Sequence, residues 1–193
     1  MKIGVLALQG DFAEHMKMLR QLGVEAFEVR LPAQLTGLAG LILPGGESTT
    51  IGKLCVDFGL LQPLQEFGQT HPIWGTCAGA ILLSRDARRS QPLLGLMDIR
   101  VQRNAFGRQV DSFEADLDIA GLGKVTNTGT PFHAFFIRAP IIESVQGSAR
   151  VLASLPDGRI VAARQDHLLA TSFHPELTGD TRFHEYFLSF IHP

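Results

Sequence analysis

Residues 75–79 read Gly75-Thr76-Cys77-Ala78-Gly79 and stand between an apolar run at residues 72–75 and a helix-like apolar run at residues 80–83. A nucleophile between small residues fits the sharp strand-to-helix turn that projects a side chain from the end of a strand. The start of a helix also favours thiolate, because the backbone dipoles point their positive ends at it. Free cysteines are more often buried structural residues, but this context favours Cys77 as a nucleophile.

Short apolar runs alternate with helical patterns on both sides of this turn. The predicted strands of the first half cover residues 2–8, 24–29, 40–43 and 72–75. The predicted helices cover residues 12–22, 48–58 and 60–67, with Ser48 or Thr49 as the N-cap of the second one. Strands that alternate with helices favour a parallel sheet covered on both faces.

The second half of the chain is richer in strand patterns. The predicted strands cover residues 98–102, 113–117, 134–137, 150–155, 159–163 and 168–173. Asp157-Gly158 predicts a hairpin turn, residues 126–131 predict an exposed loop, and residues 181–191 predict a closing helix. We therefore expect an α/β fold, with residues 1–193 as a single three-layer domain. Its mainly parallel central sheet is flanked by helices, and extra antiparallel strands lie in the second half.

The composition narrows the possible partners and compartments. The chain has 193 residues, 45% hydrophobic and 19% charged, with a net charge of −2 and two cysteines. Such a charge balance gives little support for binding to nucleic acid or to an acidic membrane surface. Two cysteines do not make a disulfide framework, and no apolar run is long enough to span a membrane. We expect a cytoplasmic protein.

A second glycine-rich loop, Pro44-Gly45-Gly46-Glu47-Ser48, also joins a predicted strand to a predicted helix. Glycines allow the backbone to approach a ligand closely and to present N–H groups to an anion. An ordinary strand-to-helix turn would explain the loop equally well. The loop is therefore a candidate binding segment only in combination with other residues.

His174 is the best candidate for the base that a thiol nucleophile needs. It follows the predicted strand 168–173 and precedes Pro175-Glu176. In an extended segment residues i and i+2 point to the same side, so Glu176 is placed to hold one ring nitrogen of His174. By itself, His174 could equally be an incidental polar residue at a strand end.

The remaining histidines and the second cysteine are given less specific roles. We expect His15 and His184 to be solvated or half-buried on helices, His133 and His167 to lie in loops or at strand ends, and Cys55 to be a core residue. No cluster of histidine, cysteine and acidic residues has the spacing of a metal site.

Taken together, these residues resemble the class I glutamine amidotransferases, which are triad-type glutaminases. The finer resemblance is to the glutaminase subunits of pyridoxal 5′-phosphate synthase, and it covers nearly the whole chain. The motifs that carry it are LQG at residues 8–10, LPGGESTT at 43–50, GTCAG at 75–79, RNAFGRQ at 103–109, FIRAP at 136–140 and SFHPEL at 172–177. Residues 126–135 form a longer stretch than is usual in this family.

The resemblance implies a role for each matching residue. Cys77 would attack the side-chain amide of L-glutamine, His174 would transfer protons, and Glu176 would orient His174. Backbone N–H groups at Gly46 and Ala78 would form the oxyanion hole. Gln9 would lie near the partner interface. The implied glutamine-binding residues are Gly46, Glu47, Ser48, Arg103, Ile137 and Arg138.

The resemblance also implies a partner, a barrel-shaped synthase subunit that uses the ammonia to make pyridoxal 5′-phosphate (vitamin B6), and no cofactor or metal on this chain. One alternative is a glutaminase subunit that serves a different synthase, such as the histidine-pathway cyclase. Another is a cysteine hydrolase or chaperone with a related nucleophile turn. A third is a regulatory binding module with a degenerate site, which the complete Cys, His and Glu set disfavours.

Overall fold

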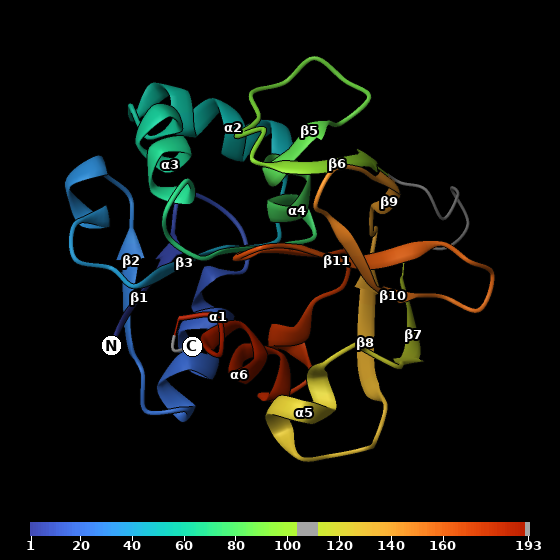
Figure 1. Cartoon of the computed structure of the whole chain (residues 1–193). Helices are drawn as coiled ribbons and strands as arrows, with labels where there is room; N and C mark the ends of the chain where they lie inside the picture. Colours follow the sequence, from blue (N-terminus) through green and yellow to red (C-terminus); the bar gives the residue numbers. More distant parts are fainter. Residues whose placement is uncertain (104–111, 192–193) are drawn as a thin grey trace.

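A computed structural model describes residues 1–103 and 112–191 and contains one large sheet with helices on both faces (Figure 1). Five strands make the parallel part of the sheet, in the order β2-β1-β3-β4-β12. Their bounds are β1 Lys2–Leu6, β2 Glu25–Val29, β3 Gly40–Leu43, β4 Ile73–Thr76 and β12 Leu168–Thr171. The strands expected at residues 2–8, 24–29, 40–43, 72–75 and 168–173 are confirmed within a few residues at their ends.

The sheet continues from β12 through strands of the second half in the order β11-β9-β6-β5, and β10 also pairs with β11. Apart from the β5–β6 pair these strands run antiparallel. A separate antiparallel pair, β7 with β8, lies beside this region. The bounds are β5 Ser84–Asp86, β6 Met97–Gln102, β7 Ser112–Leu117, β8 Phe132–Ile137, β9 Ile141–Val145, β10 Arg150–Ser154 and β11 Ile160–Gln165. The predicted fold class is confirmed, and the expected turn at Asp157-Gly158 joins β10 to β11.

The helices divide between the two faces of the sheet (Figure 1). Helices α2 Ser48–Asp57, α3 Leu61–Gly68 and α4 Ala78–Leu83 cover one face, and α1 Phe12–Gln21 and α6 Arg182–Leu188 cover the other, with α5 Leu122–Thr126 packed beside α6. A hydrophobic core lies on each face of the sheet, and alternate strand residues point into one core or the other. Leu41 packs with the first group of helices and Ile42 with the second. Burial on both faces explains the nearly continuous apolar strands.

Three elements differ from the sequence prediction because their local patterns are short or irregular. Strand β5 has three residues, β9 follows Pro140 without a clean alternation of buried and exposed positions, and α5 has five residues. The expected loop at residues 126–131 is confirmed for 127–131, which are exposed. Arg182 donates hydrogen bonds to the carbonyl oxygens of Thr130 at 2.9 Å and Pro131 at 3.1 Å, so α6 holds this loop in place.

The N-cap of α2 is Glu47, so the expectation of Ser48 or Thr49 is wrong. The Glu47 carboxylate accepts hydrogen bonds from the backbone N–H groups of Thr49 at 3.2 Å and Thr50 at 2.7 Å. Serine and threonine are common N-caps, but a carboxylate also suits a helix N-terminus, because it satisfies free N–H groups and complements the dipole. The glycine loop therefore ends in an acidic residue, Glu47, at the N-terminus of α2.

Glycines bring α4 against the strands that precede it. A Cβ at Gly79 would overlap the carbonyl oxygen of Leu43, and a Cβ at Gly75 would overlap the backbone of Gly79. The close approach of α4 to β3 and β4 therefore depends on residues without side chains. It places the residue between β4 and α4 at the carboxyl edge of the parallel strands.

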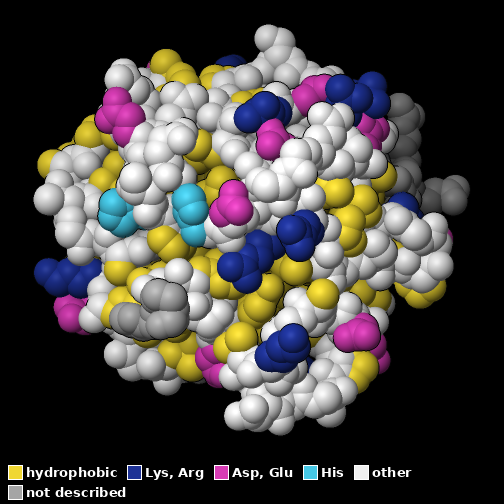
Figure 2. All heavy atoms as spheres, viewed as in Figure 1, with side chains coloured by type: hydrophobic (Ala, Val, Ile, Leu, Met, Phe, Trp, Pro, Cys, Tyr) yellow, Lys and Arg dark blue, Asp and Glu magenta, His cyan; other side chains and the backbone are white. Residues whose placement is uncertain are grey.

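The charged side chains on the face shown in Figure 2 lie interspersed by sign rather than gathered into one field, in keeping with the net charge of −2. No helix in the described part of the chain is long and apolar enough to cross a membrane.

Candidate active site

Cys77 occupies the strained turn that the sequence predicts. It lies between β4 and α4 with φ of 48° and ψ of −102°, a backbone conformation that is rare for a residue with a side chain. Its backbone N–H donates to the carbonyl oxygen of Thr171, the last residue of β12, at 2.8 Å. The neighbouring strand therefore fixes the turn, and such over-determined strain is typical of functional sites.

His174 and Glu176 lie side by side, as expected, but through a different backbone. Nδ1 of His174 lies 2.7 Å from Oε1 of Glu176, and both side chains are buried. The segment is not an extended strand, because β12 ends at Thr171 and a 3-10 helix, Pro175–Leu177, carries Glu176. The backbone N–H of His174 donates to the carbonyl oxygen of Phe135 at 2.9 Å, so β8 also positions the ring.

The ionisation of His174 reflects its two partners. Burial by itself would lower its pKa, but hydrogen bonds with Cys77 and Glu176 raise the pKa to about 10. The His174 ring is therefore protonated at neutral pH, and a positive charge of this kind is what a cysteine nucleophile needs beside it. Burial raises the pKa of the Glu176 carboxyl, and the hydrogen bond with His174 opposes that shift.

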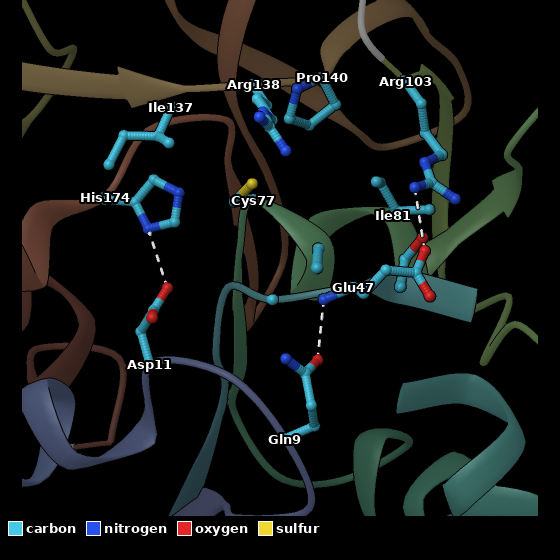
Figure 3. Close-up of a pocket in the computed structure, with 13 residues that line it drawn as sticks. Gln9, Asp11, Glu47, Cys77, Ile81, Arg103, Ile137, Arg138, Pro140 and His174 are labelled. Atoms are coloured by element: carbon cyan, nitrogen blue, oxygen red, sulfur yellow. Dashed lines mark hydrogen bonds and ion pairs between the residues drawn. The ribbon is translucent and has the colours of Figure 1, made fainter. Parts of the chain in front are cut away.

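A pocket of about 420 Å³ opens in front of Cys77 and His174 (Figure 3). The structure brings nearly every predicted site residue to its wall, whereas Glu176 lies behind His174. The lining residues are Gln9, Asp11, Gly46, Glu47, Ser48, Cys77, Ala78, Ile81, Arg103, Ile137, Arg138, Pro140 and His174. A pocket of this size fits a small-molecule substrate.

One side of the pocket carries a charge network. Arg103 Nη2 lies 2.9 Å from Glu47 Oε1, and Arg103 Nη1 donates to Thr49 Oγ1 at 3.1 Å. Partial burial would raise the pKa of Glu47, but hydrogen bonds from Thr50 and Thr49 and the charge of Arg103 lower it to about 2. Glu47 is therefore an anion at all physiological pH values. The rest of the 103–109 motif lies outside the described residues.

The 9–11 loop supports the glycine loop. Gln9 Oε1 accepts a hydrogen bond from the backbone N–H of Glu47 at 2.8 Å, and the backbone N–H of Asp11 donates to the carbonyl oxygen of Gly45 at 3.1 Å. Gly46 has a φ of 149°, and a Cβ there would lie 2.6 Å from Gln9 Oε1. The conformation around the predicted oxyanion hole is thus coupled to Gln9.

Sequence reasoning missed three lining residues, namely Asp11, Ile81 and Pro140. Asp11 Oδ2 lies 3.5 Å from Nδ1 of His174, and Asp11, His174 and Glu176 offer ligand atoms that lie within 4.8 Å of one another. No sequence spacing indicates this group, because Asp11 comes from the opposite end of the chain. Ile81 lies one helical turn after Cys77, which is a signal that helix periodicity offers.

The expectation that His15 and His184 are solvated or half-buried is wrong, because both are fully buried. The positions of Phe12, His15, Met16 and Leu19 in α1 follow an i, i+3, i+4, i+7 pattern, so periodicity places His15 on the apolar face. Cys55 is a core residue as expected, and burial raises the pKa of its thiol to about 12. His133 is exposed near the start of β8, and His167 lies in the turn before β12.

The fold and the pocket define the class, a class I glutamine amidotransferase. A solved structure described as a glutamine amidotransferase matches with a TM-score of 0.90 and 48% identity, covering 98% of each chain. A solved PurLQS structure from Thermotoga maritima, 14% identical with a TM-score of 0.72 over 98% of each chain, shares the fold. Residues 5–192 match the SNO glutamine amidotransferase family.

The curated relatives narrow the class further. The chain is 61% identical to "Pyridoxal 5′-phosphate synthase subunit PdxT" of Herpetosiphon aurantiacus, over 97% of this chain and 99% of the relative. It is 58% identical to the protein of the same name from Moorella thermoacetica, over 99% and 100%. This chain belongs to the SNO glutamine amidotransferase family. The resemblance drawn from the motifs and the glutaminase activity that it implies are confirmed.

Proposed function

We propose that Cys77, His174 and Glu176 are the catalytic triad of a glutaminase that supplies ammonia for pyridoxal 5′-phosphate synthesis. The observation that carries the assignment is the position of His174, which lines the same pocket as Cys77 and holds Glu176 behind it, with Nδ1 of His174 2.7 Å from Oε1 of Glu176. This is the nucleophile–base–orienter arrangement of covalent amide hydrolysis. The shared name of the curated relatives supports the same role.

The geometry supports a two-step mechanism. The Cys77 thiolate attacks the side-chain amide carbon of L-glutamine, and backbone N–H groups at Gly46 and Ala78 stabilise the oxyanion that forms. His174 gives its proton to the leaving nitrogen, so ammonia departs and a thioester remains. A water molecule then loses a proton to His174 and attacks the thioester, which releases glutamate and restores the thiolate–imidazolium pair.

The proposed glutamine-binding residues line the same pocket, namely Gly46, Glu47, Ser48, Arg103, Ile137 and Arg138. The two arginines have different surroundings. Arg103 is bound to Glu47 and Thr49, which supports a role in organising the glycine loop and α2. Arg138 extends toward Cys77 in Figure 3, which supports contact with the α-carboxylate of the substrate.

The ammonia acceptor is proposed to be the barrel-shaped synthase subunit, docked near Gln9. Gln9 contacts the loop that would supply an oxyanion donor, so a partner at this position can influence catalysis directly. A different synthase is the alternative acceptor. We also propose that residues 1–193 act as one glutamine amidotransferase domain, and that the protein works in the cytoplasm, where both cysteines stay free.

The test measures ammonia and glutamate released from L-glutamine by the purified chain with the pyridoxal 5′-phosphate synthase barrel subunit, and with the histidine-pathway cyclase as the control partner. We expect stimulation, and formation of pyridoxal 5′-phosphate from glutamine, only with the first partner. Stimulation by the cyclase alone would assign the chain to another pathway. Failure to hydrolyse glutamine with either partner would contradict the triad.

A further inference from the structure

Two buried histidines lie directly behind the proposed triad and have no part in the mechanism above. His15 on α1 and His184 on α6 are 169 positions apart, yet Nδ1 of His15 lies 3.0 Å from Nε2 of His184. Neither side chain is exposed. The ring of Trp74 packs edge-on against both, with centroid distances of 5.5 Å and 4.9 Å. Burying two polar rings in an apolar core costs free energy unless the rings form hydrogen bonds with one another or with a nearby group.

His15 reaches the carboxylate of Glu176. Nε2 of His15 lies 3.3 Å from Oε2 of Glu176 and 3.2 Å from Oγ1 of Thr76, the residue before Cys77. Oε1 of Glu176 is occupied by His174, whereas Oε2 is buried and, among the described residues, has no hydrogen bond of good geometry. Nε2 of His15 therefore faces a buried carboxylate oxygen that needs a donor.

Only one pair of tautomers suits these contacts. If Nε2 of His15 carries the proton, its N–H donates to Oγ1 of Thr76 and its positive end lies 3.3 Å from Oε2 of Glu176, while Nδ1 accepts from Nε2–H of His184. Nδ1 of His184, which is buried without a partner among the described residues, is then a bare acceptor. The opposite tautomers would place a lone pair against Oε2 and bury an unpaired N–H at His184, which is less favourable.

Both rings are neutral in this arrangement. Burial, together with the nearby His184 and His174, lowers the pKa of His15 well below its ordinary value, and burial lowers the pKa of His184 to about 3. A neutral donor supports the Glu176 anion without competing with the His174 imidazolium for its charge.

We propose that His15, held in its tautomer by His184, is a positioning residue that stabilises the ionised Glu176 carboxylate and keeps it aligned with His174. This inference rests on the proposed role of Glu176 in the triad. It extends the triad inward across four elements, since β4 carries Thr76, the 3-10 helix carries Glu176, and α1 and α6 carry the two histidines.

The proposal predicts an effect on turnover and on its pH dependence. Replacing His15 with an apolar residue removes the N–H group that lies closest to Oε2 on its buried side, so kcat falls about 10- to 100-fold, with little change in the KM for glutamine. The pKa of Glu176 rises, so the carboxylate is protonated at a higher pH as the pH is lowered. The acid limb of the pH profile therefore moves to higher pH. The other titratable groups that act on Glu176 are His174 and Asp11, and neither of them is altered.

The experiment compares His15→Phe and His15→Leu with His15→Gln, whose side-chain N–H can replace Nε2–H, and with His184→Phe. Each is measured in the complex with the barrel subunit for kcat, KM, the pH profile of kcat, and the melting temperature. Glu176→Gln is the reference, since normal activity in that variant would contradict the triad itself rather than the role of His15.

The proposal is supported if the apolar His15 variants lose turnover and their acid limb moves to higher pH, while His15→Gln stays within about threefold of wild type. Wild-type kcat and an unmoved acid limb in the apolar variants would overturn it, as would equal losses in His15→Gln and His15→Phe. If neither apolar variant folds, His184→Phe decides. An acid limb that moves to higher pH in His184→Phe supports the proposal, and an unchanged pH profile in that variant overturns it.

Discussion

At the scale of single residues, His174 lies beside three groups, of which Cys77 and Asp11 come from distant positions in the chain. Its ring faces Cys77 and Glu176, and Asp11 approaches the same nitrogen that Glu176 binds. A protonated imidazole beside a cysteine favours the reactive thiolate, so the raised pKa of His174 suits a nucleophile at Cys77. The proposed role of each partner can be tested by a substitution that changes one group and preserves its shape.

Cys77→Ala is expected to abolish glutaminase activity while the fold and partner binding survive. Removing a triad nucleophile typically lowers the rate by several orders of magnitude, because no other group forms the covalent intermediate. The measurement is ammonia release by the purified complex, with the melting temperature as the control for folding. Turnover near the wild-type rate would end the proposed mechanism.

Alkylation should distinguish the two cysteines at neutral pH. Cys77 lines the pocket beside the His174 cation, whereas Cys55 is fully buried in α2 and its pKa is raised to about 12. Because the thiolate is the reactive form, Cys77 should react much faster. Brief iodoacetamide treatment followed by mass-spectrometric mapping measures this, and preferential labelling of Cys55 would contradict both assignments.

Glu176→Gln should lower kcat and leave the KM for glutamine nearly unchanged. The carboxylate touches His174 and lies outside the pocket wall, so its loss weakens the orientation and charge of the base rather than substrate binding. Steady-state kinetics at saturating partner separate the two constants. If only KM changes, Glu176 belongs to substrate binding.

At the scale of elements, the site depends on two strand-to-helix turns, both built with glycine. The turn at Cys77 is held by the contact of α4 with β3 and by the hydrogen bond to Thr171, and the turn at Gly46 is held by Gln9 and Asp11. In each case glycine, which has no side chain, lets two backbone segments approach closely. The first turn places the nucleophile, and the second places a proposed oxyanion donor.

Gly79→Ala should destabilise the protein by roughly 1–3 kcal/mol, which is typical of overpacking in a closely packed interior. The new methyl group would overlap the carbonyl oxygen of Leu43, and a backbone neighbour cannot rotate away. Denaturant unfolding measures the change. Gly129→Ala is the matched control, because a Cβ there meets nothing within 4 Å, and it should change stability by less than about 0.5 kcal/mol.

At the scale of the whole molecule, the structure places the pocket where the 9–11 loop, the glycine loop and β8 meet, with Ile137 at its exposed rim. Free ammonia is lost if it forms before an acceptor is ready, so control by the synthase has a functional reason. The glycine loop offers the means, since glycine changes φ and ψ with little steric penalty. One peptide there can move between orientations with its N–H toward or away from the site.

The isolated chain is therefore expected to be a weak glutaminase that its synthase stimulates strongly. Loss of one oxyanion donor typically lowers kcat by about 10²–10³-fold, so the partner needs to favour the active state by only ~3–4 kcal/mol. The measurement is the kcat of the chain alone and at saturating synthase. Equal values would rule out gating and leave the triad assignment intact.

The sequence by itself determined the strand–turn–helix at Cys77, the parallel sheet formed mainly by the first half, the hairpin at Asp157-Gly158, and the family. These features are local, because apolar periodicity and glycine positions act within a few residues. The residues predicted to bind glutamine line the same pocket as Cys77 and His174, and their roles stay predictions. Each motif is a short segment, so the residues within it stay together in the fold.

Only the tertiary structure decided which distant residues surround those motifs. The pairing of His15 with His184, the approach of Asp11 to His174, and the ion pair of Arg103 with Glu47 all depend on how the elements pack. Sequence periodicity assigns a residue to a helix face, but it does not say what that face meets across the sheet. Contacts of this kind arise from packing between elements, which local patterns do not encode.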